Sequence, residues 1–161
     1  MEVNGGSVTR TFTIQNTGTG VLNLGADSVT ITGAGFALEG AQPATTVAAG
    51  GNVTFQVKFD PSAAGAVTGS VSIANDDADE NPYNFNINGT GLIPEMNVQG
   101  NSQTIADNDL VPETGDHTAF GDVEVNGGSV TRTFTIQNTG TGVLNLGADS
   151  VTITGAGFAL E

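Results

Sequence analysis

The chain of 161 residues contains no cysteine, no tryptophan, one histidine and only three basic residues. Without cysteine it forms no disulfide framework and offers no thiol nucleophile. A zinc site needs several nitrogen or sulfur ligands, and His117 has no second histidine or cysteine to share one with. A nucleic-acid binder needs a basic surface, which Arg10, Lys58 and Arg132 cannot supply. No apolar run reaches the length that spans a bilayer. We therefore predict no nucleic-acid partner, because the basic surface is missing, and no membrane insertion, because the apolar run is missing.

The same scarcity argues against catalysis. Paired carboxylates that cleave glycosides normally lie in a cleft lined by aromatic rings, and the chain has one tyrosine besides its phenylalanines. No serine lies in a recognisable nucleophile elbow. We therefore predict that the protein is not an enzyme and has no catalytic residue.

Acidic residues and turn-forming residues are abundant instead. Seventeen Asp and Glu residues give a net charge of −14, and there are 24 glycines. Glycine together with Thr, Asn and Val is typical of short strands joined by tight turns. The charged partners that suit such a surface are cations such as Ca²⁺, although an acidic surface also serves solubility alone.

The most informative feature is an internal repeat. Residues 2–39 recur letter for letter as residues 124–161, an offset of 124 − 2 = 122 residues. Solenoid units have periods of about 20–50 residues, so this period is too long for one. It suits a β-sandwich domain of about 100 residues followed by a linker.

Alternation of apolar and polar residues predicts β-strands and no helix. The apolar positions place strands at 8–15, 22–24, 29–31, 36–38, 53–59, 67–73, 83–87 and 96–99. The loop 75–82 is predicted to join two of these strands as a hairpin.

Pro94, after Gly89-Thr90-Gly91, marks a predicted domain boundary. We expect residues 2–93 to form a β-sandwich that lacks its first strand, and residues 95–161 to form the opening strands of the next repeat. An exposed sheet edge follows, which three arrangements would resolve. Residues 95–123 could complete 2–93, the repeated segment 124–161 could compete with its twin, or 95–161 could complete a neighbouring chain. The third predicts head-to-tail assembly of copies of the protein.

Three stretches resemble the bacterial choice-of-anchor D repeats, which are Ig-like modules related to Hydin-type (ASH) domains. They are Phe12–Gly20 (FTIQNTGTG), Val57–Gly65 (VKFDPSAAG) and Val71–Gly91, and PEMNVQGN at 94–101 is similar to the start of a further repeat. The resemblance implies an all-β, Ig-like antiparallel β-sandwich without catalytic residues, in tandem copies at the bacterial cell surface or in secreted proteins. The expected function is a spacer or an extracellular fibre assembled by β-strand complementation. The alternative is an adhesin that binds a glycan or protein through its loops.

Two acidic segments are candidate calcium sites, because Ca²⁺ prefers carboxylate and carbonyl oxygens. The loop 75–82 contains Asp76, Asp77 and Asp79, and the irregular segment 101–122 contains Asp107, Asp109 and Asp116. Neither has the spacing of an EF-hand loop. The alternative for the loop 75–82 is a solvated hairpin tip, and the alternative for the segment 101–122 is a flexible loop. For each segment, calcium binding and its alternative both stay open.

Overall fold

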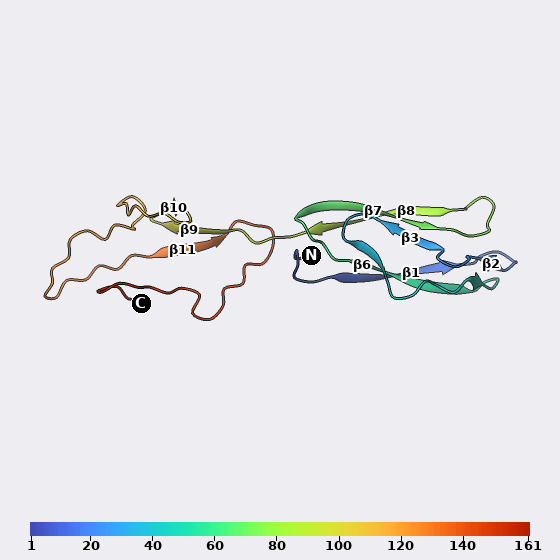
Figure 1. Cartoon of the computed structure of the whole chain (residues 1–161), viewed down its shortest axis with the longest axis horizontal. Coiled ribbons are helices and arrows are strands. Elements are labelled where there is room, and N and C mark those ends of the chain that lie inside the picture. The colour runs from blue at the N-terminus through green and yellow to red at the C-terminus, as the bar shows by residue number, and fades with distance from the viewer. The chain divides into compact units, whose positions relative to one another are not determined.

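The computed structural model describes all residues, 1–161, and consists of eleven β-strands without a helix (Figure 1). No helix is therefore available that could cross a membrane. The chain divides into two compact units, residues 1–93 (unit 1) and 94–161 (unit 2). All pairings between the named strands are antiparallel. The prediction of an all-β, antiparallel fold is confirmed.

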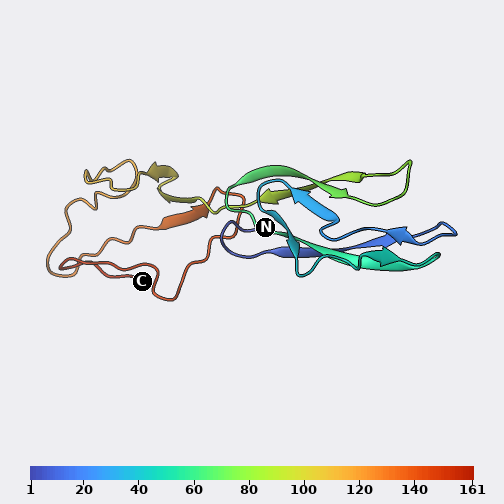
Figure 2. The ribbon, with the colours of Figure 1, turned by 45° about the vertical axis from the view of Figure 1, so that its right-hand side comes forward.

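Unit 1 consists of two three-stranded sheets and one strand pair. One sheet has the order β1-β6-β4, the other has the order β3-β7-β8, and β2 pairs with β5. Figures 1 and 2 show the two sheets as separate layers. The strand bounds are β1 Val8–Gln15, β2 Leu22–Asn23, β3 Val29–Thr32, β4 Phe36–Glu39, β5 Thr46–Val47, β6 Asn52–Phe59, β7 Gly65–Ile73 and β8 Tyr83–Gly91.

Alternation along β1 and β6 sets their register. Phe12 lies opposite Phe55 and Ile14 opposite Val53, so these apolar residues meet on the same face. Arg10, opposite Val57, interrupts the pattern. The predicted hairpin is also confirmed, because β7 and β8 pair from Gly65 opposite Gly91 to Ile73 opposite Tyr83.

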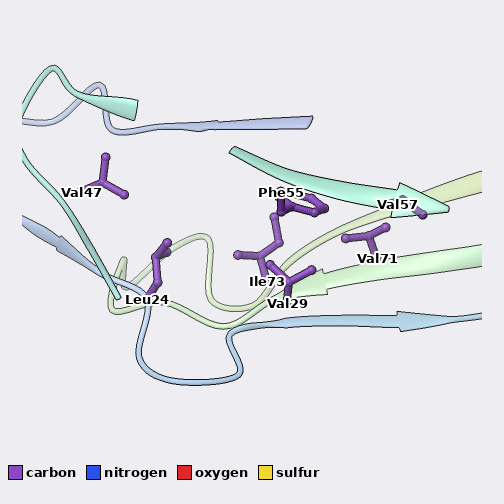
Figure 3. Close-up of a cluster of buried hydrophobic side chains, with 7 residues drawn as sticks. All are labelled: Leu24, Val29, Val47, Phe55, Val57, Val71 and Ile73. Carbon is purple, nitrogen blue, oxygen red and sulfur yellow. The ribbon is translucent and has the colours of Figure 1, made fainter. Parts of the chain in front are cut away.

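One apolar cluster lies between the two sheets (Figure 3). It draws buried side chains from both sheets and from the β2–β5 pair: Leu24, Val29, Val47, Phe55, Val57, Val71 and Ile73. The ring of Phe12 stacks on Phe55 at a centroid distance of 5.5 Å and lies 5.4 Å from the ring of Phe85 on β8. Burying each such side chain contributes about 1.5–3 kcal/mol, so this cluster makes a large contribution to the stability of unit 1.

Unit 2 contains a single small sheet. Its strands are β9 Met96–Gly100, β10 Gln103–Ile105 and β11 Phe134–Asn138, in the order β10-β9-β11. A methyl group on Gly100 would collide with the backbone carbonyl oxygen of Asp116, so the segment around Asp116 approaches the end of β9 closely. Only glycine allows that approach.

The repeated sequence adopts different structures in the two units. Residues 2–39 form four strands, β1 to β4, whereas the identical residues 124–161 form only β11. Leu24 is 4% exposed and its twin Leu146 is 50% exposed. That residues 124–161 are the opening strands of a further repeat stays a prediction; here they form a strand only at Phe134–Asn138. The physical reason is that residues 40–93 supply β5 to β8, against which the first copy packs, and unit 2 has no equivalent.

Candidate functional site

Strand β1 forms an open edge of its sheet. In the order β1-β6-β4 it pairs only with β6, so one side of its backbone has no neighbouring strand. Strand β8 is likewise an outer strand, in the order β3-β7-β8. Natural proteins usually cover, shorten or charge such edges because they pair readily with other strands. β1 has eight residues, of which only Arg10 is charged, so its open side is well suited to receive another strand.

A groove runs along the open side of unit 1, where β1 and β8 face each other. It consists of two hollows of about 600 and 540 Å³, and Phe12 lines both of them. We call them together the edge groove. Its lining is mixed. The apolar part comes from both sheets and includes Val8, Phe12, Ile14, Phe59, Phe85 and Ile87, while Arg10, Asp77 and Glu80 also line the hollows. An apolar strand laid along β1 would cover the half-buried members of this set, such as Phe12 and Ile14.

A buried asparagine closes one end of β1. The Asn16 Nδ2 atom donates hydrogen bonds to the carbonyl oxygens of Gly20 (2.8 Å) and Val47 (2.9 Å). Its Oδ1 atom accepts a hydrogen bond from the Gly18 N–H at 3.0 Å. These bonds satisfy a buried polar side chain and fix the turn that follows the strand.

The same edge sequence is paired with another strand in unit 2. In unit 2, β11 has the sequence of residues 12–16, and β9 pairs with it from Phe134 opposite Gly100 to Asn138 opposite Met96. The Thr139 N–H donates to the Glu95 carbonyl oxygen at 2.7 Å, and Asn138 Oδ1 accepts from the Glu95 N–H at 3.2 Å. The structure therefore shows which strand this sequence accepts at its edge.

The hairpin tip between β7 and β8 holds the first predicted calcium ligands. Asp76 accepts hydrogen bonds from the backbone N–H of Asn23 (2.7 Å) and from its side-chain amide. The Asn23 side chain lowers the pKa of Asp76, with a smaller contribution from the Asn23 backbone. A hydrogen bond with Asp79 raises the pKa of Asp77. Asp77 and Asp79 thus lie together, while Asp76 is engaged by β2.

The second candidate segment is held by local hydrogen bonds. Asp116 is buried, and its Oδ1 atom accepts from the Thr118 N–H (3.0 Å) and hydroxyl (2.6 Å), which together lower its pKa. Asp109 accepts from the Val111 N–H at 3.0 Å, and Asp107 accepts from Asn108 at 2.9 Å.

No group of three or more His, Asp or Glu side chains in the chain is arranged to hold a metal ion. Neither acidic segment therefore presents a preassembled calcium site, and calcium binding stays a prediction. Melting curves in Ca²⁺ and in a chelator separate the interpretations: a raised midpoint in Ca²⁺ supports binding, and an unchanged midpoint supports solvated loops.

The contact between Asp76 and Asn23 makes a testable prediction about pH. Because the folded state lowers the pKa of Asp76, the contact stabilises unit 1 above the ordinary aspartate pKa of about 3.9. That contribution is lost as the pH falls through the lowered folded value. We expect Asn23→Ala to raise the pKa of Asp76 toward its ordinary value, as measured by NMR titration of the carboxyl carbon.

Asn145 provides the matched control, because it is the twin of Asn23 in the repeated segment. Asn145→Ala should leave the Asp76 titration unchanged. An Asp76 midpoint that is the same in the wild type and in Asn23→Ala would contradict the assigned cause.

Comparisons with known proteins add no relative. A scan against protein-family models finds no match, and searches of curated proteins and of solved structures find none either.

The edge groove was only partly foreseen from sequence. The repeat and the boundary at Pro94 predicted an exposed sheet edge, but not which strand would carry it or that β8 would form the opposite wall. The available signal was the repeat itself. Residues 12–16 recur as residues 134–138, and another stretch predicted to form a strand, 96–99, precedes that second copy.

Proposed function

We propose that the protein is a structural repeat of a bacterial surface or secreted protein, whose role is cohesion between units rather than chemistry. In this proposal unit 1 is an Ig-like β-sandwich that lacks its first strand. The sheet orders support this: β1-β6-β4 corresponds to strands B-E-D of the Ig fold and β3-β7-β8 to strands C-F-G. The strand without a counterpart in unit 1 is A, which would pair with the open edge of β1.

A single observation carries the proposal. A long, nearly uncharged sheet edge borders a groove that exposes apolar side chains from both sheets, and the same edge sequence is paired with β9 elsewhere in the chain. A strand donated by a neighbour completes such an edge through main-chain hydrogen bonds, while pockets for alternate side chains give specificity. Because donor and acceptor are different surfaces, each added copy leaves both a donor and an acceptor, and growth is head-to-tail.

The protein is therefore expected to self-associate. Size-exclusion chromatography with light scattering should show a mass that rises with protein concentration, and negative-stain electron microscopy should show linear oligomers. A chain that stays monomeric at the highest attainable concentration would contradict fibre formation and leave only the role of a passive spacer.

A further inference from the structure

The repeated sequence indicates how two copies would join at the atomic level. β11 pairs with β9 in a defined register, and residues 134–138 are identical to residues 12–16 of unit 1. Subtracting the offset of 122 residues converts each observed pair into a pair on the open edge of β1: 134 − 122 = 12 and 138 − 122 = 16.

Resting on the proposed function, we propose that β9 of one copy pairs with β1 of a second copy, antiparallel, with Gly100 opposite Phe12 and Met96 opposite Asn16. Thr13 then lies opposite Gln99, and Ile14 lies opposite Val98. The Asn16 side chain and the Thr17 N–H would meet the backbone of Glu95 as Asn138 and Thr139 do in unit 2.

The side chains of β9 suit the edge groove in this register. Residues opposite each other in an antiparallel pair point to the same face, so Val98 lies beside Ile14, which packs against the apolar cluster. Gly100 lies beside Phe12, which lines both hollows of the groove. A side chain at position 100 would crowd that ring, because in unit 2 a methyl group on Gly100 would lie 3.0 Å from the equivalent ring of Phe134. The polar residues Gln99 and Asn97 then lie beside Thr13 and Gln15 on the exposed face.

Chain length excludes the chain's own β9 as the occupant in this register. Leu92 is held near the Val8 end of β1, because it forms backbone hydrogen bonds with Met1 and Val3. The next residue, Asn4, donates to the carbonyl oxygen of Pro61, which comes shortly after the β6 residue that pairs with Val8. In the proposed register Met96 lies beside Asn16, at the other end of β1. The eight residues of the strand separate the two ends by about 26 Å. Only four residue steps separate Leu92 from Met96, and these span at most about 14 Å. The donor must therefore be a second copy.

An exchange of partners makes β9 available. β9 leaves β11 and pairs with the same sequence in β1 of the second copy, so the hydrogen bonds it loses are remade with identical residues. β1 is the better partner because β6 already holds it on its other side, whereas β11 has no second neighbour. The exchange also covers the edge groove, which is open in the separate chain.

Disulfide trapping tests the register, and the chain has no cysteine of its own to interfere. The experiment mixes a Thr13→Cys variant with a mass-tagged Gln99→Cys variant under mild oxidation and measures the heterodimer by mass spectrometry. Directly opposed residues are close enough for a disulfide, whereas a shift of two residues separates them by about 7–8 Å, beyond its usual reach. We expect several-fold more heterodimer from this pair than from Thr11→Cys mixed with Gln99→Cys.

Two further measurements make every outcome decisive. Thr135→Cys and Gln99→Cys in one chain should form an intramolecular disulfide at low concentration, which shows that this pair of positions can be bridged. Light scattering on the same mixtures reports assembly. Assembly without a preferred disulfide between positions 13 and 99 would overturn the register and leave the proposed function standing, while absence of both assembly and that disulfide would overturn both.

Discussion

Replacing Leu24 by alanine is expected to destabilise unit 1 by about 2–5 kcal/mol. Leu24 is 4% exposed and belongs to the apolar cluster between the sheets, so truncation leaves a cavity there. The loss should appear in urea denaturation and as faster amide hydrogen exchange in β6 and β7.

The repeat provides a control that few proteins offer. Leu146 stands in the same sequence as Leu24 but is 50% exposed, so Leu146→Ala is expected to change stability by less than about 0.5 kcal/mol. Equal losses from the two variants would contradict the structure, because they would mean that both copies of the segment share the packing site beside residues 40–93.

A methyl group at Gly100 is expected to disrupt unit 2. Gly100→Ala places a carbon against the backbone carbonyl oxygen of Asp116, and backbone cannot move aside as a flexible side chain can. Overpacking of this kind costs about 1–3 kcal/mol. We expect amide exchange to quicken throughout β9 and β11, and self-association to weaken because β9 is the proposed donor strand.

Gly115→Ala is the matched control for this substitution. Gly115 lies in the same unit, and a methyl group there meets no atom within 4 Å. It should leave exchange in β9 unchanged. Unchanged exchange in Gly100→Ala as well would show that the segment at Asp116 does not pack on β9.

The long strands of unit 1 were predictable because each largely alternates apolar and polar residues, although Arg10 breaks the pattern in β1, and each meets a partner with a similar pattern. Val53, Phe55, Val57 and Phe59 face the core as predicted, and the hairpin of β7 and β8 follows from turn residues at 75–82. β5 was missed, since two residues are too few to show alternation. Its pairing with β2 depends on Val47 entering the cluster, a contact distant in sequence.

The repeated segment shows why local pattern was insufficient elsewhere. The residues at 22–24 and 144–146 are the same, yet only the first set contributes a strand. A strand is stabilised by its neighbours, and those of the first copy come from residues 40–93. The acidic segments illustrate the same limit, because spacing placed Asp76 and Asp77 in one loop but could not reveal that Asn23 engages Asp76 alone.

The attachment of Leu92 at the Val8 end of β1 has a mechanical consequence for a filament of the proposed kind. The donor strand would leave the joint at the Asn16 end, while the acceptor chain continues from the opposite end through its own Leu92. Tension would therefore pull the two strands past each other lengthwise. Hydrogen bonds between antiparallel strands run across the strand direction, so they would share that load and yield together instead of unzipping one by one. A joint of this geometry resists stretching better than its small number of bonds suggests.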